Sequence, residues 1–164
     1  MLPEEIRQRL KSRIAATSHP RELVVDIMYE LQSHYGFLND VAVKEVAELL
    51  DLSPLQVEEL ATFYDFIYRQ PVGRFVLHVC DGVVCWMFEE KSAMAYICKR
   101  LGVYPGETTE DGRFTVLPSV CIGYCDHAPA MLVNGKLYGP LTPEKIDSIL
   151  DELRTISCDL VICR

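Results

Sequence analysis

Two pairs of cysteines are the residues of this sequence whose types and spacing most clearly predict chemistry. Four residues separate Cys80 from Cys85 in "CDGVVC", and three separate Cys121 from Cys125 in "PSVCIGYCDHAP". Each pair follows a predicted strand, and each loop contains a glycine at which the backbone can curl around a buried group. Four thiolates from two neighbouring loops suit either a tetrahedral zinc ion or a [2Fe–2S] cluster. The sequence therefore predicts a metal centre at these loops.

The spacing of the first pair favours the cluster over zinc. A gap of four residues is the one that plant-type ferredoxins use for one of their cysteine pairs. Two iron atoms bridged by sulfide also need a wider cradle than a single zinc ion. A zinc-stabilised interaction module without a redox role remains the alternative from a different class. A thiol–disulfide oxidoreductase is disfavoured, because no Cys-x-x-Cys stands at the first strand-to-helix turn.

The residues around the cysteines predict how the sulfur atoms are held. A helix is expected to begin near Trp86, and the positive end of its dipole would favour a thiolate at Cys85. Backbone N–H groups around Gly82 and Gly123 are expected to donate hydrogen bonds to sulfur and so to set a reduction potential.

The other three cysteines and the histidines carry weaker signals. Cys98 falls on the apolar face of a predicted helix, which predicts a buried structural thiol. Cys158 and Cys163 repeat the four-residue gap, but they follow the last predicted helix without a glycine loop, so no ligand role is expected. His127, beside Cys125, is expected to donate a hydrogen bond near the site rather than to bind metal.

The composition limits the kinds of molecule and compartment with which the chain is expected to associate. The chain has 164 residues, 49% of them hydrophobic, and a net charge of −8 from 16 basic and 24 acidic residues. No basic patch overrides this acidic balance, so nucleic-acid binding is not expected. The sequence has no signal-type apolar run and no stretch of about 18 apolar residues that would insert into a membrane. A cytoplasmic protein with reduced cysteines is therefore expected.

Residues 1–72 are predicted to form an N-terminal helical bundle. Apolar residues recur at helical spacing in "HPRELVVDIMYELQSHYG", and Gly36 is a plausible C-terminal cap. A second helix is expected after a capping Asn39 or Asp40. A third is expected after Ser53, because Pro54 suits the first helical position and Gln56 can complete a capping box.

Residues 73–164 are predicted to form a second domain with a small mixed sheet covered by helices. Strands are expected over 74–79 and 113–117, with a helix between them that ends near Gly102. A hairpin is expected at Asn134-Gly135, a dipeptide that tolerates the positive φ of a type I′ turn. A last helix begins at Thr142 and Pro143. The whole chain is thus predicted to be α+β.

Four motifs resemble a known family: "ATFYDFIYRQPVGRF", "CDGVVC", "TTEDGRFTVLPSVCIGYCDHAPAMLVNG" and "LTPEKID". They are similar to the thioredoxin-like [2Fe–2S] subunit of respiratory complex I, the E subunit of bacterial NADH–quinone oxidoreductase. The resemblance runs from about Glu22 to Leu153. It implies a thioredoxin-like [2Fe–2S] ferredoxin domain behind the helical bundle, with one [2Fe–2S] cluster. The implied iron ligands are Cys80, Cys85, Cys121 and Cys125.

The resemblance also implies partners and a reaction. The chain would be an electron carrier that exchanges single electrons with a flavin-bearing NADH-oxidising subunit, beside further iron–sulfur subunits of the same complex. FMN and NADH would bind only to the partner, because this sequence has no "GxGxxG" fingerprint. The complex would lie peripherally on the cytoplasmic face of the inner membrane. The alternative is an equivalent diaphorase subunit of an NAD-reducing hydrogenase or formate dehydrogenase.

Overall fold

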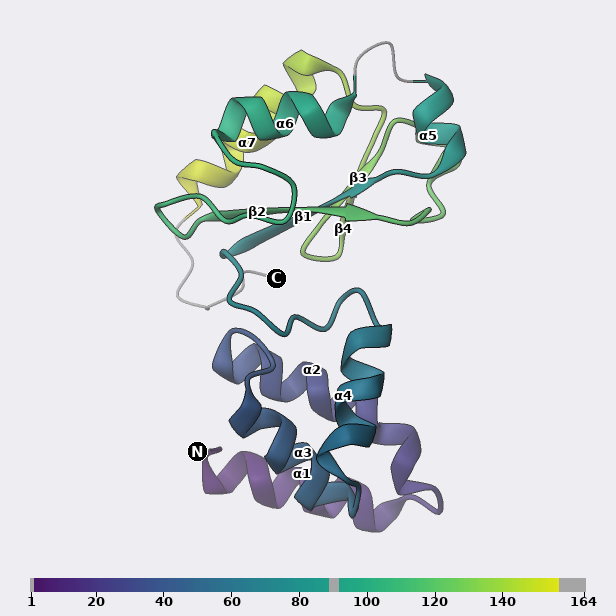
Figure 1. Ribbon diagram of the computed structural model, residues 1–164, viewed down its shortest axis with the longest axis vertical. Helices are drawn as coiled ribbons and strands as arrows, with labels where there is room; N and C mark the ends of the chain where they lie inside the picture. Colours follow the sequence, from purple (N-terminus) through teal and green to yellow (C-terminus); the bar gives the residue numbers. More distant parts are fainter. Residues whose placement is uncertain (1, 89–91, 157–164) are drawn as a thin grey trace. The chain divides into compact units, whose positions relative to one another are not determined.

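The computed structural model describes residues 2–88 and 92–156, which form two compact units, Met1–Pro71 and Val72–Arg164 (Figure 1). Each unit has its own hydrophobic core, with no residue shared between the two. All regular elements of the first unit are helical, and the second unit combines helices with a four-stranded sheet. The expectation of a chain that mixes helices with a sheet is confirmed.

The first unit buries one apolar face of each of its helices. Its elements are α1 (Glu4–Ala16), the 3₁₀ helix η1 (Pro20–Leu23), α2 (Val24–Tyr35), α3 (Asp40–Leu50) and α4 (Pro54–Phe63). The most deeply buried large side chains in its core are Leu10, Ile27, Met28, Leu31 and Leu38. The helix expected before Gly36 is α2, and the short helix η1 directly precedes it.

Three helix ends of this unit lie where the capping residues predicted them. The Ser53 hydroxyl accepts a hydrogen bond from the Gln56 backbone N–H, and the Gln56 side chain accepts one from the Ser53 N–H, which completes the capping box. Asn39 caps α3 by accepting from the Ala42 N–H at 2.9 Å. Gly36 ends α2 with a φ of 85°, a left-handed conformation that suits glycine.

The second unit is built on a mixed sheet with the strand order β2-β1-β3-β4. In chain order its elements are β1 (Phe75–Cys80), α5 (Val83–Phe88), α6 (Ala93–Leu101), β2 (Phe114–Ser119), the 3₁₀ helix η2 (Cys125–His127), β3 (Met131–Val133), β4 (Lys136–Tyr138) and α7 (Pro143–Thr155). Strands β1 and β2 are parallel, whereas β3 pairs antiparallel with both β1 and β4. The hairpin between β3 and β4 is confirmed, with positive φ angles at Asn134 and Gly135.

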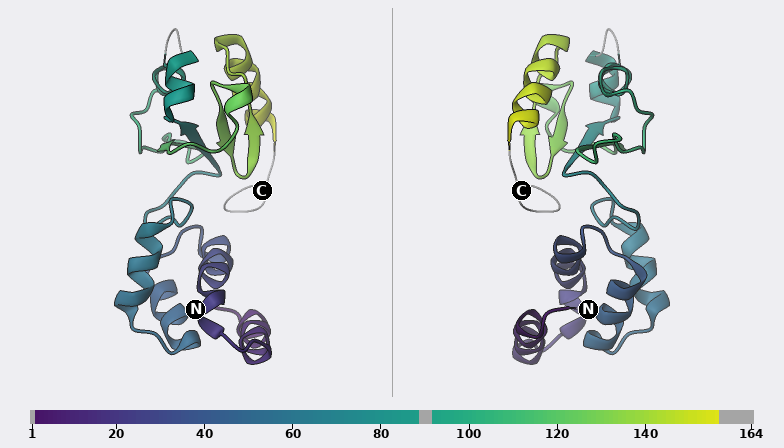
Figure 2. Two further views of the ribbon diagram at one scale, coloured as in Figure 1. Left: turned by 90° about the vertical axis from the view of Figure 1, so that its right-hand side faces the viewer. Right: turned by 90° about the vertical axis from the view of Figure 1, so that its left-hand side faces the viewer.

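Helices α6 and α7 cover one face of this sheet (Figures 1 and 2). Their apolar side chains, among them Ile97 and Leu150, share a core with Leu77 of β1 and Phe114 of β2. Helix α6 ends at Gly102 with a φ of 72°, as its sequence predicts. Helix α5 lies apart from this pair, at the end of the sheet where β1 finishes (Figure 1). It begins at Val83 rather than near Trp86, so that expectation is wrong.

Candidate metal centre

The sheet brings the two cysteine loops to the same edge. Cys80 is the last residue of β1, and its register partner in the parallel strand β2 is Ser119, two residues before Cys121. The loops that follow β1 and β2 therefore lie next to each other at the carboxyl ends of the strands. Binding sites usually lie at this end of parallel strands. Cys85 lies in the first turn of α5, and Cys125 is the first residue of η2. The structure thus gathers all four cysteines that the sequence singles out.

The four sulfur atoms form a connected set. The Sγ atoms of Cys121 and Cys125 lie 3.4 Å apart. The Cys80 thiol joins the two pairs, because it hydrogen-bonds with both Cys85 and Cys121. Four thiols from segments about forty residues apart therefore face one another across a single small space.

Gly82 is the point of closest approach between the two loops. A Cβ atom at this position would lie 3.1 Å from the Cys121 Cβ and 3.4 Å from the Cys80 Sγ. A side chain there would press on a cysteine of each pair, so glycine permits the loops to approach as they do. Gly123 has a different role, because its φ of 79° lies in the left-handed region and turns the second loop.

The first pair is buried and the second is accessible. Cys80 and Cys85 are 5% and 2% exposed, whereas Cys121 is exposed and Cys125 is partly so. Burial raises the pKa of the Cys85 thiol to about 11, and its hydrogen bond with Cys80 adds to the shift. The helix dipole expected to favour a Cys85 thiolate is thus outweighed by the loss of hydration.

In the accessible pair, hydrogen bonds shift the pKa values of the two thiols in opposite directions. A hydrogen bond from the Gly123 backbone N–H, followed by one with Cys125, lowers the pKa of Cys121. The hydrogen bond with Cys121 and then burial raise the pKa of Cys125. The predicted donation from backbone to sulfur is therefore found at Gly123. Of the two accessible thiols, Cys121 therefore loses its proton more readily than Cys125.

A third segment, which the sequence did not single out, closes the site. The Cys80 backbone N–H donates to the Ala130 carbonyl at 3.1 Å, and the Ala130 backbone N–H interacts with the Cys85 sulfur. Ala130 is 1% exposed and shares a small buried cluster with Cys80 and Cys85. The available sequence signal is the Ala-Pro-Ala run directly before β3, which marks a tight entry into the strand beside β1.

The remaining candidates, Cys98 and His127, lie on α6 and η2. Cys98 is buried on α6 in the core between the helices and the sheet, with its sulfur 3.8 Å from that of Met94, so the prediction of a structural thiol is confirmed. His127 stacks on Tyr124 with ring centroids 4.4 Å apart, and its Nδ1 lies 3.0 Å from the Asp126 carboxylate. Cys158 and Cys163, for which no ligand role was expected, lie outside the described residues.

The donor set alone suits two kinds of metal centre. Within residues 2–88 and 92–156, no three His, Cys, Asp or Glu side chains are placed to hold one metal ion. A tetrahedral zinc ion and a [2Fe–2S] cluster can both take four cysteine ligands.

Comparison with known proteins distinguishes between these two centres. The family model of the thioredoxin-like [2Fe-2S] ferredoxin matches residues 10–154, a span that contains all four cysteines. The chain therefore belongs to the thioredoxin-like [2Fe–2S] ferredoxin family, and the resemblance expected from the motifs is confirmed. A [2Fe–2S] cluster is the cofactor of this family, which decides against the zinc alternative.

Two relatives and one solved structure are similar to this chain over most of its length. The E subunit of NADH-quinone oxidoreductase from Pseudomonas aeruginosa is 36% identical over 151 residues, which cover 92% of this chain and 91% of the relative. The E subunit from Escherichia coli K12 is also 36% identical, over 90% of this chain and 89% of its own length. Among solved structures, an NAD⁺-reducing [NiFe]-hydrogenase in the H₂-reduced state matches with a TM-score of 0.72 and 27% identity over 84% of this chain. The chain spans only 23% of that hydrogenase chain.

None of the helices in the described part of the chain is long and apolar enough to cross a membrane.

Proposed function

We propose that this chain is the [2Fe–2S] electron-transfer subunit of an NADH–quinone oxidoreductase and exchanges single electrons with the FMN of a partner subunit. The observation that carries the proposal is the convergence of four cysteine thiols at one edge of the sheet. The relatives from NADH–quinone oxidoreductases, which match this chain over about nine-tenths of its length, support the same function.

In this proposal Cys80, Cys85, Cys121 and Cys125 would hold the cluster. When bound, the cluster would supply a site that gains or loses one electron. The chain's own contribution is to hold the sulfur atoms. Burial of Cys80 and Cys85 keeps water from one side, and the Gly123 N–H donates to the Cys121 sulfur on the exposed side.

The partners follow from the absence of a nucleotide fingerprint in the sequence and from the names of the relatives. NADH and FMN bind to the flavin-bearing subunit, and further iron–sulfur subunits complete the complex. The complex lies on the cytoplasmic face of the inner membrane. Residues 1–72 act as a separate helical bundle that helps to attach residues 73–164 to the complex. The four-helix composition and separate core of the first unit support this division of roles.

The proposal is tested by analysing anaerobically purified protein. Iron and acid-labile sulfide are expected in equal amounts, two of each per chain for one [2Fe–2S] cluster. Reduction is expected to produce the electron paramagnetic resonance signal of such a cluster, and NADH should produce it only when the flavin-bearing subunit is present. Stoichiometric zinc without sulfide would exclude the proposal. A signal that NADH produces with the isolated chain would contradict the assignment of NADH and FMN to the partner.

A second candidate is the equivalent subunit of an NAD-reducing hydrogenase. The match to the NAD⁺-reducing [NiFe]-hydrogenase favours it, with a TM-score of 0.70 in the air-oxidised state. Co-purification distinguishes the two functions. Nickel in the purified complex would select the hydrogenase, whereas recovery with quinone-reducing activity from the membrane fraction would select the oxidoreductase.

A further inference from the structure

The accessible cysteine pair is placed for a second kind of chemistry, the formation of a disulfide within one loop. The Sγ atoms of Cys121 and Cys125 lie 3.4 Å apart, whereas the sulfur–sulfur bond of a disulfide is about 2.05 Å long. The two sulfur atoms therefore need to approach by only about 1.4 Å to form the bond.

The loop between these two cysteines has room for this movement. Residues 120–124 belong to no helix or strand, so no ladder of backbone hydrogen bonds fixes them. Gly123 lies midway along the loop with a φ of 79°, and a Cβ atom at this position would meet nothing within 4 Å. A small shift of the backbone there costs no packing, which allows the two sulfur atoms to approach.

Cys80 is the competing partner for Cys121, because the two thiols are hydrogen-bonded. Cys80 ends strand β1, however, and its backbone N–H donates to the Ala130 carbonyl at 3.1 Å. The strand therefore holds Cys80 in place, and only 5% of its surface is exposed. Cys125 shares the adjustable loop with Cys121, so it is the thiol that Cys121 meets when the loop moves.

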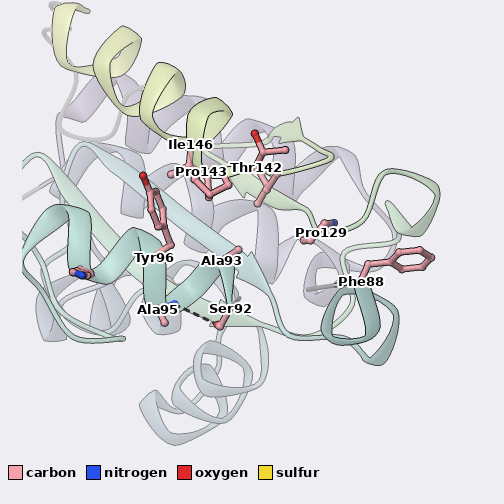
Figure 3. A pocket seen from close by; sticks show the side chains of 11 residues that line it. Phe88, Ser92, Ala93, Ala95, Tyr96, Pro129, Thr142, Pro143 and Ile146 are labelled. Atoms are coloured by element: carbon pink, nitrogen blue, oxygen red, sulfur yellow. Dashed lines mark hydrogen bonds between the residues drawn. The ribbon is translucent and has the colours of Figure 1, made fainter. Parts of the chain in front are cut away.

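A small oxidant can reach Cys121 directly from solvent. Cys121 is exposed and Cys125 is partly so, whereas the other three cysteines in the described part of the chain are buried. The pocket between α6 and α7 is lined by none of these five cysteines (Figure 3). The oxidant is therefore expected to react on collision with the exposed loop and not from a binding pocket.

We propose that Cys121 and Cys125 of the iron-free chain form a reversible disulfide by exchange with a small disulfide such as oxidised glutathione. The Cys121 sulfur attacks one sulfur of glutathione disulfide, which gives a mixed disulfide and releases one molecule of glutathione. The Cys125 sulfur then attacks the Cys121 sulfur and releases the second glutathione. Two protein thiols are oxidised, one small disulfide is reduced, and the two thiol protons leave with the two glutathione molecules.

The disulfide would control when the chain can bind a cluster. It removes two of the four proposed ligands, so an oxidised chain has to be reduced by a thiol before it takes up iron. It also protects an exposed thiol, since oxidation to sulfinic or sulfonic acid is essentially irreversible whereas a disulfide is not. This consequence rests on the function proposed above, but formation of the disulfide does not.

The test uses the iron-free full chain with Cys158→Ser and Cys163→Ser, which remove the two cysteines outside the described residues. Of the seven cysteines in the sequence, five then remain. The protein is equilibrated anaerobically with mixtures of reduced and oxidised glutathione. It is then unfolded in acid, treated with N-ethylmaleimide and analysed by mass spectrometry of its peptides. We expect the free thiols to fall from five to three per chain, with one disulfide between residues 121 and 125 that dithiothreitol reverses completely.

Two further substitutions in this background identify the order of the steps. Cys125→Ser should stop the reaction at the mixed disulfide, so that one glutathione stays attached to Cys121. The matched control is Cys80→Ser, which removes the competing thiol and should leave the disulfide and the glutathione ratio at which it forms unchanged. A disulfide between Cys80 and Cys121, or five free thiols at every glutathione ratio, would overturn the inference.

The same experiment on the chain loaded with iron and sulfide separates this inference from the proposed function. Binding to iron should protect both thiols, so we expect at least about tenfold less disulfide at the same glutathione ratio. A loaded chain that forms the disulfide as fully as the iron-free chain and keeps its iron would overturn the ligand assignment in the proposed function. The inference about the iron-free chain would stand.

Discussion

The two ends of strand β1 pack in very different ways. Phe75, Leu77 and Val79 lie in a core of fifteen buried residues shared with α6 and α7. One residue later, Cys80 lies in a cluster of only three, with Cys85 and Ala130. The first region therefore buries much more apolar surface than the second.

This difference suggests that stability and function are separated along one strand. The face under α6 and α7 holds the sheet together, and the cysteine end depends on contacts that the chain does not supply itself. A bound cluster between the sulfur atoms would replace missing packing on the inner side. The two regions should therefore respond differently to substitutions.

The largest effect is expected from Leu150→Ala in the large core. Leu150 is fully buried between α7 and the sheet. Truncation of such a side chain costs about 2–5 kcal/mol, because it leaves a cavity as well as losing burial. Denaturant unfolding should show this loss equally in the iron-free and the loaded protein. A loss confined to the iron-free protein would contradict the separation of the two regions.

The opposite behaviour is expected from Cys121→Ala. Cys121 is exposed, so the iron-free protein should change its free energy of unfolding by no more than about 0.5 kcal/mol. Iron and sulfide content should fall at least about tenfold, since one of four ligands is lost. The control is Cys98→Ala, which removes a thiol outside the site and should leave the iron content unchanged. Full iron in the Cys121 variant would remove this residue from the ligand set.

Much of the site could be predicted from sequence because local rules govern its parts. Two apolar strands that each end in a cysteine loop place their cysteines together when the strands are parallel neighbours. The Asn134-Gly135 turn and the capping box at Ser53 follow from the conformations that these residues favour. That the four cysteines bind iron stays a prediction, which the metal assays above address.

Other features could not be predicted because they depend on contacts between distant segments. Helix α5 has six residues without a capping signal, and its apolar run has no clear helical period, so the sequence does not indicate its start at Val83. The shift of the Cys85 pKa depends on burial, which the sequence around it does not reveal. The contribution of Ala130 requires the antiparallel pairing of β1 with β3.

Thiol reactivity should distinguish the two cysteine pairs in the iron-free protein. The thiolate is the reactive form, and its fraction falls tenfold for each pH unit below the pKa. Since the pKa of Cys85 is raised to about 11 and that of Cys121 is lowered from 9.0, iodoacetamide should label Cys121 at least about tenfold faster at neutral pH, even though a thiolate of lower pKa is the weaker nucleophile. Mass spectrometry of labelled peptides measures both rates.

The dependence of these rates on pH is a further check on their cause. Labelling of Cys121 should stop increasing at a lower pH than labelling of Cys85, because a lower pKa means that deprotonation is complete sooner. Cys85 should continue to gain reactivity until about pH 11. Equal rates for the two thiols would show that burial of the inner pair does not protect it.

The smallest effect on iron binding is expected from Gly82→Ala, which tests how closely the two cysteine loops must approach. The added methyl group would lie 3.1 Å from the Cys121 Cβ, so the second loop must move by a few tenths of an ångström. We expect a cost of about 1 kcal/mol, at the low end for overpacking, because the Cys121 loop is exposed and free to adjust.

That small displacement should change iron binding more than it changes the free energy of unfolding. The variant should bind iron but release it to a chelator severalfold faster, because the sulfur atoms of the two loops are held farther apart. The control is Val120→Ala, which shortens an exposed side chain on the same loop without altering the approach. If both variants retain iron as well as the unchanged chain, the spacing set by Gly82 is not what holds the cluster, and the loops adapt to it after it binds.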